Sequence, residues 1–250
     1  MPSNDIKGTT ALVTGASRGF GRGIAAALSG AGAAVVGVAR DGAALGELRA
    51  ELGESFIPVS ADAADPTVAG QLIDAYRPGI VVLNAGVAPL SRPLQHHTWE
   101  TFSRNWDTDV KQVFHWLREA LLAPLPPGST VIAMSSGAAL RGSPLSGGYA
   151  GSKATIRFIT SYAAAESERG GLGIRFISVL PQLTPATELG AAAVAAYAAR
   201  EGMDVAAYRE RSGPALTPGQ AGEAFVALAS DPGHGAGPYL LTAAGLSPVP

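Results

Sequence analysis

The sequence contains no cysteine. Disulfide bonds, a thiolate nucleophile and a cysteine-ligated metal site are therefore excluded, and the composition is compatible with a reducing cytosol. The histidines at positions 96, 97, 115 and 234 lack the spacing of metal ligands, so no metal site is expected. A cytoplasmic location is the expectation.

An excess of charge of one sign is also lacking. The chain carries a formal net charge of −2, which gives no case for a nucleic-acid partner or an anionic membrane surface. The longest uncharged stretch, residues 23–39, is interrupted by glycines at 30 and 32 and indicates a helix end followed by a strand. No membrane-spanning helix, N-terminal signal or internal repeat is evident.

Apolar runs alternate along the chain with longer helical patterns. Hydrophobic residues make up 47% of the 250 residues and charged residues 15%, which suffices for a substantial core in one domain. Most runs are continuous instead of alternating between polar and apolar, as expected for strands covered on both faces of a parallel sheet. The strand candidates are residues 10–14, 33–38, 56–60, 80–84, 130–135, 175–179 and 239–242.

Helix starts are marked between these runs. Asp65-Pro66 and Thr217-Pro218 each place a capping side chain before a first-turn proline, and Gln220 completes a capping box with Thr217. The repeated alternation predicts an α/β fold: a single-domain, doubly wound parallel sheet with helices on both faces.

A glycine-rich turn, TGASRGFG at residues 14–21, follows the first predicted strand. Gly15, Gly19 and Gly21 allow a sharp turn and a close approach to a pyrophosphate. The helix predicted from about residue 18 to 28 points its N-terminal N–H groups at the phosphates. The spacing alone is a weak signal, and the strand before it and the helix after it strengthen it. The turn therefore indicates a phosphate-bearing cofactor.

Arginines lie at two places that suit a cofactor with a 2′-phosphate. Arg40 ends the second predicted strand, where an acidic side chain would hold ribose hydroxyls and an arginine accommodates a 2′-phosphate. Arg18, in the glycine turn, is within reach of the same phosphate. NADPH is favoured over NADH on this basis. Asp41 argues against this preference, because it is an acidic side chain near the end of the same strand. The simpler alternative is that both arginines are solvated surface residues.

Tyr149 and Lys153 lie one helical turn apart, with Ser136 upstream. A free phenol titrates near 10, too high for efficient proton donation at neutral pH. A lysine on the same helix face favours the phenolate. A serine hydroxyl donates a hydrogen bond to a carbonyl oxygen and polarises it. The three side chains form a set that moves a proton to or from a carbonyl oxygen.

Taken in order, these motifs resemble the classical short-chain dehydrogenase/reductase family over nearly the whole chain. The motifs are the glycine turn, Asp62-Ala63, Asn84-Ala85-Gly86, Ser136 and Tyr149-x-x-x-Lys153. The resemblance implies a Rossmann-type sheet of seven parallel strands in one domain over residues 1–250. Its cofactor half would span about 8–125, its catalytic and substrate half about 126–250, and a mobile lid about 184–212.

The resemblance also implies residue roles. Asp62 and Ala63 would contact the adenine ring, Lys153 would hydrogen-bond the nicotinamide ribose, and Tyr149 would supply the proton while hydride passes from nicotinamide to a carbonyl carbon. The full implied set of cofactor contacts is Gly15, Ser17, Arg18, Phe20, Gly21, Arg40, Asp62, Ala63, Asn84, Ala85, Gly86, Tyr149, Lys153, Pro181, Leu183 and Thr184.

The chain departs from the family pattern at two positions. Asp109 occupies the place of an asparagine that usually completes the catalytic set, and Asn105, one turn earlier, is a less favoured substitute. By resemblance this position relays protons to the lysine through a water. An aspartate there would either pair with Lys153 or shuttle protons itself. Gln182 replaces a glycine after the sixth strand, with Thr184 and Thr187 as candidates for the carboxamide contact.

The function expected from these features is NADPH-dependent carbonyl reduction, or the reverse alcohol oxidation, on a small-to-medium, mostly apolar substrate. The alanine-rich segment 189–200 is interpreted as part of the lid, with an ordinary amphipathic helix as the alternative. A 3-oxoacyl-carrier-protein reductase and a non-catalytic NADP-binding regulator are the alternative functions. By analogy, a homotetramer or homodimer is expected.

Overall fold

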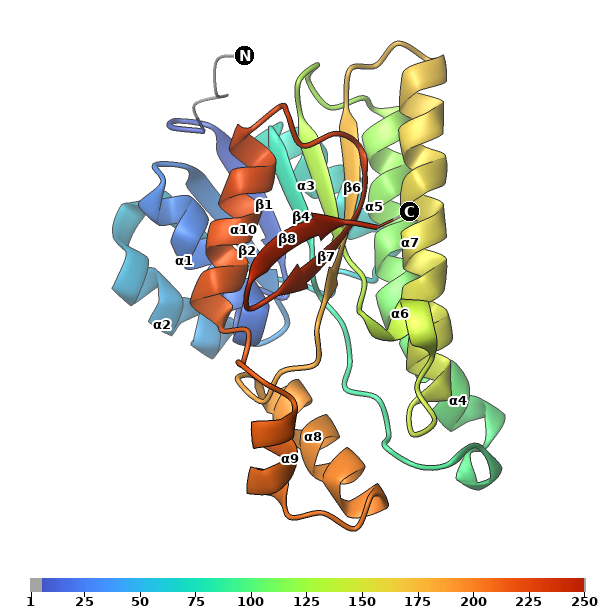
Figure 1. Cartoon of the computed structure of the whole chain (residues 1–250). Coiled ribbons are helices and arrows are strands. Elements are labelled where there is room, and N and C mark those ends of the chain that lie inside the picture. The colour runs from blue at the N-terminus through green and yellow to red at the C-terminus, as the bar shows by residue number, and fades with distance from the viewer. Residues whose placement is uncertain (1–5, 250) are drawn as a thin grey trace.

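One eight-stranded sheet runs through the computed structural model, which describes residues 6–249. The strand order is β3-β2-β1-β4-β5-β6-β7-β8 (Figure 1). The neighbouring strands from β3 to β7 pair in parallel, and β8 returns antiparallel to β7. The strands are β1 (Thr10–Thr14), β2 (Ala34–Ala39), β3 (Phe56–Ser60), β4 (Ile80–Leu83), β5 (Thr130–Met134), β6 (Arg175–Pro181), β7 (Gly237–Thr242) and β8 (Gly245–Pro248).

The central strands are buried on both faces, which explains their continuous apolar sequences. In β1, Leu12 packs into one core cluster and Val13 into the other, because successive side chains of a strand point to opposite faces. Both side chains are fully buried. A strand of this kind can lie only between two helical layers.

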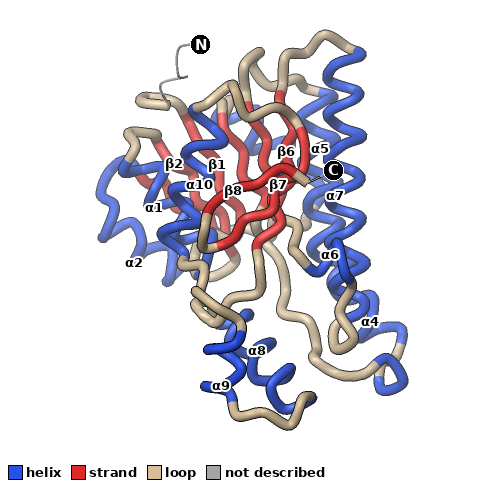
Figure 2. Tube along the Cα trace, viewed as in Figure 1, coloured by secondary structure: helices blue, strands red, loops and turns tan. Residues whose placement is uncertain are grey.

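Helices cover the two faces of the sheet (Figure 2). The first layer consists of α1 (Gly19–Gly30), α2 (Gly42–Leu52) and α10 (Pro218–Ser230), and it shares a core with Val13. The second layer consists of α3 (Pro66–Tyr76), α5 (Lys111–Leu122) and α7 (Gly147–Arg169), and it shares a core with Leu12. The predicted caps are confirmed: Asp65 accepts from Thr67 N, and Thr217 and Gln220 form a capping box.

The short helix η1 (Gly53–Ser55) directly precedes β3. The other short elements follow the carboxyl ends of parallel strands: η2 (Leu94–His96), α4 (Trp99–Asn105), the π-helix η3 (Trp106–Val110), α6 (Ala138–Arg141), α8 (Glu188–Arg200) and α9 (Val205–Arg211). Helices α8 and α9 project beyond the sheet as a pair (Figure 1). Within residues 6–249, no helix combines the length and the apolarity that crossing a membrane requires.

The predicted fold class is confirmed, with one difference in strand count. The seven predicted strands are present with ends shifted by a residue or two, and β8 is an eighth. Residues 245–248 have the sequence Gly-Leu-Ser-Pro and show neither a continuous apolar run nor an alternation. β8 is mostly exposed at the sheet edge, so its sequence does not need the apolar pattern of a buried strand.

Candidate active site

The glycine turn joins β1 to α1. Gly15 has φ +68°, and a Cβ atom on Gly21 would lie 2.1 Å from the carbonyl oxygen of Gly15, so the close packing of the turn requires glycine at position 21. Arg18 stands at the N-cap of α1 and provides no side-chain cap. The first-turn N–H groups of α1 therefore receive no capping side chain, which suits them to a phosphate.

A buried network fixes the segment 84–86 against this turn. The hydroxyl of Thr14 accepts from the backbone N–H groups of Asn84 and Ala85 and lies 2.6 Å from Gln112 Oε1. Gln112 Nε2 donates to the Ala85 carbonyl, and Asn84 Nδ2 donates to the carbonyls of Thr14 and Gly15. Asn84 thus joins β4 to β1. Sequence reasoning missed Gln112, which lies within a helix and follows no recognisable spacing.

The two arginines near the turn have different surroundings. Arg40 follows β2 directly and is exposed, while Asp41 caps α2 by accepting from Ala44 N at 3.0 Å. β2 ends at Ala39, one residue beyond the predicted end, and Asp41 is the second residue after it. Arg18 forms an ion pair at 3.0 Å with Glu188, the first residue of α8. This partner was not predicted.

After β3, Asp62 and Ala63 form a tight turn. Asp62 Oδ1 accepts from Ala64 N at 2.9 Å, and the buried Trp116 donates its indole N–H to the Ala63 carbonyl at 3.0 Å. The backbone of this turn is held from the α5 side. Contact of Asp62 and Ala63 with an adenine ring stays a prediction.

Helix α7 is docked onto the end of β5 by hydrogen bonds around Lys153. Ser135 Oγ donates to the Lys153 carbonyl at 2.7 Å, and Lys153 Nζ donates to the Met134 carbonyl at 3.1 Å. Ser136 follows directly, and its Oγ accepts from Ala138 N at 3.2 Å, which leaves its hydroxyl proton for another acceptor. Tyr149 presents its ring to the lysine, with Nζ 5.5 Å from the ring centroid.

Asp109 reaches the same lysine from the π-helix η3. Its Oδ2 lies 3.1 Å from Lys153 Nζ, and its Oδ1 accepts from Val87 N at 2.9 Å. Both side chains of the ion pair are at least 95% buried. A Cβ atom on Gly86 would lie 2.8 Å from Asp109 Oδ2, so glycine there is what admits the carboxylate. Asn105 instead donates its side-chain amide to the Val87 carbonyl at 2.8 Å.

The electrostatics of this pair follow from its burial. Desolvation works against the charged ammonium and would lower the pKa of Lys153. The neighbouring Asp109 carboxylate, the Tyr149 phenol and the hydrogen bond to Asp109 outweigh desolvation, so the pKa of Lys153 is raised above its ordinary value. Lys153 is therefore a fixed positive charge throughout the neutral range.

The segment after β6 is tied to the segment that follows α9. Gln182 Nε2 donates to the Pro214 carbonyl at 2.9 Å, and the buried Thr184 hydroxyl donates to the Leu216 carbonyl at 2.8 Å. Thr187 caps α8 by accepting from Gly190 N. Pro181 is buried at the end of β6, while Leu183 is 44% exposed.

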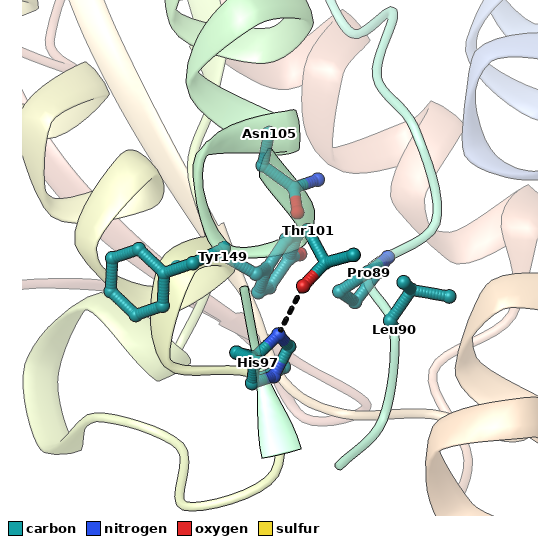
Figure 3. Close-up of a pocket in the computed structure, with 9 residues that line it drawn as sticks. Pro89, Leu90, His97, Thr101, Asn105 and Tyr149 are labelled. Carbon is teal, nitrogen blue, oxygen red and sulfur yellow. Dashed lines mark hydrogen bonds between the residues drawn. The ribbon is translucent and has the colours of Figure 1, made fainter. Parts of the chain in front are cut away.

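Two hollows lie near these residues. A narrow depression beside Tyr149 is lined by Pro89, Leu90, His97, Thr101, Phe102, Asn105, Ser146 and Gly148 (Figure 3). In it, His97 Nδ1 lies 3.2 Å from the Thr101 hydroxyl. A cavity of about 240 Å³ separates Gln182, Leu183 and Pro185 from Val194, Tyr208 and Arg209 of α8 and α9. Among residues 6–249, no three His, Asp or Glu side chains group as metal ligands would.

The sheet order and the glycine turn define a Rossmann-type nucleotide-binding α/β protein. The model of the short chain dehydrogenase family matches residues 9–198. The chain therefore belongs to the classical short-chain dehydrogenase/reductase family and is an oxidoreductase.

Particular relatives agree with this assignment. The chain is 30% identical over 194 residues to a probable NADP-dependent dehydrogenase of Haemophilus influenzae, covering 73% of this chain and 74% of the relative. It is 31% identical over 173 residues to an NADPH-dependent pterin aldehyde reductase of Arabidopsis thaliana, covering 66% and 72%. In fold it resembles a 3-ketoacyl-(acyl-carrier-protein) reductase of Brucella melitensis complexed with NADH, with a TM-score of 0.78, 23% identity and coverage of 95% and 98%.

Proposed function

We propose that this protein is an NADPH-dependent carbonyl reductase, or the reverse alcohol dehydrogenase, acting at a CH–OH group. The observation that carries the proposal is the buried ammonium of Lys153, held between the Asp109 carboxylate and the Met134 carbonyl and facing the Tyr149 ring. A charged lysine beside a phenol has a direct use in proton transfer to a carbonyl oxygen. The preference for NADPH is supported by Arg40 directly after β2 and by two relatives, a probable NADP-dependent dehydrogenase and an NADPH-dependent pterin aldehyde reductase.

The chain's own residues fit this cofactor. The uncapped first turn of α1 suits the pyrophosphate, and the exposed Arg18 and Arg40 suit a 2′-phosphate. Asp62 and Ala63 would border the adenine ring, and Lys153 would hydrogen-bond the nicotinamide ribose. When bound, NADPH supplies the hydride for the carbonyl carbon.

Tyr149 is the proposed acid and base. In reduction its hydroxyl donates a proton to the forming alkoxide, and in oxidation its phenolate accepts one. The positive charge of Lys153, with Nζ 5.5 Å from the ring centroid, stabilises the phenolate. Asp109 keeps that lysine charged but also offsets part of its field, so the two carboxylate effects oppose each other at Tyr149.

Ser136 is proposed to orient the substrate oxygen. Its Oγ already accepts from Ala138 N, so the hydroxyl proton is free to point at a carbonyl oxygen. The bond between Ser135 Oγ and the Lys153 carbonyl ties the segment after β5, which carries Ser136, to helix α7, which carries Tyr149. This bond fixes the relative placement of the hydroxyl and the phenol.

The substrate is proposed to be small to medium and mostly apolar. Apolar residues (Pro89, Leu90, Phe102) and polar residues (His97, Thr101, Asn105, Ser146) both line the depression beside Tyr149. The segment of about residues 184–212, which contains helices α8 and α9, is proposed to act as the lid of the site. For an acidic carrier-protein substrate, free basic residues on the lid would be expected. Arg200, Arg209 and Arg211 of this segment are offset by Glu201, Asp204 and Glu210, and Arg211 is paired with Glu201, so a 3-oxoacyl-carrier-protein reductase is the less favoured alternative.

Self-association and a cytoplasmic location are also proposed. Phe114 and Leu122 of α5 and Phe158 and Tyr162 of α7 are each more than half exposed, which is unusual for such large side chains and supports a homodimer or homotetramer. Sedimentation velocity would test this, since a single monomeric species would contradict it. A cytoplasmic location stays a prediction from the cysteine-free sequence.

The decisive experiment follows reduced-cofactor absorbance with NADPH and NADH across a panel of ketones and quinones. Turnover that prefers NADPH supports the proposal. The wild-type chain is compared with Tyr149→Phe and with Tyr162→Phe, the same substitution at an exposed site of the same helix. Tight NADPH binding with no turnover on any carbonyl would favour the non-catalytic NADP-binding regulator.

A further inference from the structure

The N-terminal end of the lid helix α8 rests on the glycine turn. A Cβ atom on Gly19 would lie only 3.7 Å from Cγ2 of Thr187, the N-cap of α8. Next to this contact, Arg18 Nη1 lies 3.0 Å from Glu188 Oε2. Because Thr187 caps the helix by accepting from Gly190 N, the position of Glu188 beside the turn is set by the fold.

We propose that Glu188 determines how strongly the protein discriminates NADPH from NADH, by competing with the 2′-phosphate for Arg18. The inference rests on the proposed NADPH-dependent function. A phosphate and a carboxylate both bind a guanidinium through charge-assisted hydrogen bonds. NADPH has to displace Glu188 to use Arg18, whereas NADH, which lacks the 2′-phosphate, leaves the ion pair intact.

The ion pair is weak enough to be displaced. The Arg18 and Glu188 side chains are 77% and 81% exposed, and exposed pairs contribute little because water screens them. A dianionic phosphate held also by Arg40 would outcompete a single carboxylate at this position. Asp41, the carboxylate that follows Arg40 in the chain, accepts from Ala44 N as the cap of α2. Glu188 is therefore the acidic side chain that competes with the 2′-phosphate for Arg18.

The expected effect of Glu188→Gln is a tighter complex with NADPH. We expect the Kd of NADPH to fall about two- to fivefold and the Kd of NADH to change less, as suits the strength of an exposed ion pair. The matched control is Glu201→Gln, which breaks the exposed Arg211–Glu201 pair of the same lid away from the turn. Its ratio of the two Kd values should equal that of the wild type.

The test is isothermal titration of NADPH, NADH, 2′,5′-ADP and 5′-AMP into the full chain at low salt. Wild type, Glu188→Gln, Arg18→Gln and the double variant form a double-mutant cycle. The inference is supported when Glu188→Gln tightens only the two 2′-phosphorylated ligands, and when that gain disappears in the Arg18→Gln background. An unchanged ratio in Glu188→Gln, or an equal gain without Arg18, overturns it.

Failure of the proposed function gives a different result. A wild type that binds NADH at least as tightly as NADPH, or that turns over no carbonyl, contradicts the function. The change in the Kd ratio caused by Glu188→Gln still tests the competition, whichever cofactor the wild type prefers.

Discussion

Lys153 and Asp109 form a buried ion pair, with 3.1 Å between the ammonium nitrogen and Oδ2 of the carboxylate. The residues come from α7 and from the π-helix η3, and each has a further backbone partner, the Met134 carbonyl for the lysine and Val87 N for the aspartate. A π-helical turn often marks a functional site, and here it carries the carboxylate. The pair connects the fold's stability to the proposed proton transfer.

The first prediction concerns alkaline stability. The folded pKa of Lys153 is raised above the ordinary 10.5, so its contribution to the free energy of unfolding is fully present below about 10.5 and is lost as the pH rises through the folded pKa. Urea unfolding between pH 8 and pH 12 checks this. The double variant Lys153→Met/Asp109→Asn removes both charges. Its free energy of unfolding should therefore fall less than that of the wild type as the pH rises. Identical profiles would contradict the prediction.

The second prediction concerns Asp109→Asn. The amide oxygen can still accept from Val87 N, but the amide NH2 then takes the place of Oδ2 beside the Lys153 ammonium, so the ion pair is lost. Loss of the negative charge leaves the field of Lys153 at Tyr149 less opposed, which favours the phenolate in the proton-transfer step. We expect activity within about tenfold of wild type and a pH–rate profile displaced to lower pH. A profile equal to wild type would remove any special role for the carboxylate.

The third prediction concerns Tyr149→Phe. Removal of the proposed proton donor should lower kcat by about 10²–10⁴-fold, while the Kd of NADPH measured by titration changes little. Stopped-flow or steady-state absorbance gives kcat. Tyr162→Phe, more than half exposed on the same helix, should behave as wild type. Equal rates in both variants would assign the proton transfer to another group.

The fourth prediction concerns glycines with different surroundings. A Cβ atom on Gly21 would lie 2.1 Å from the Gly15 carbonyl oxygen, so Gly21→Ala should distort the turn and weaken NADPH binding by at least tenfold. Gly46, inside α2, has open space around a Cβ, and Gly46→Ala should stabilise the fold by about 0.5–1 kcal/mol. Titration and thermal unfolding of both variants check the pair. Unaltered cofactor binding in Gly21→Ala would refute the role of the close contact.

The fifth prediction concerns Thr184, whose side chain the structure buries. Its hydroxyl donates to the Leu216 carbonyl and accepts from Ala186 N. Thr184→Val leaves both backbone partners without this hydrogen bond and should lower the free energy of unfolding by about 1–3 kcal/mol. Thr184→Ser keeps the hydroxyl and should have a stability close to that of the wild type. Urea unfolding gives the difference. A loss of NADPH affinity in Thr184→Val without a loss of stability would instead favour the predicted cofactor contact.

Much of the fold was predictable because its signals are local. A strand buried on both faces has to be continuously apolar, as in residues 80–83, and a capping side chain before a proline marks a helix start, as at Asp65 and Thr217. Each signal lies within a few residues. β8 has no such signal in its sequence, because an exposed edge strand does not need apolar residues.

The candidate site was predictable only in part. Tyr149 and Lys153 lie on one helix, so their spacing alone places both side chains on one face. An ion pair between Asp109 and Lys153 was one of two alternatives. The ion pair forms because η3 and α7 approach each other closely, which the sequence does not show.

The sequence by itself determined the α/β class, the glycine turn and the tyrosine–lysine pair, because each depends on neighbouring residues of the chain. Only the tertiary structure decided that Glu188 meets Arg18 across 170 positions, that Gln182 binds the Pro214 carbonyl, and that Thr14 and Gln112 share a buried hydrogen bond. Contacts of this kind form where separate elements pack together, and residue type and spacing along the chain carry no record of such packing.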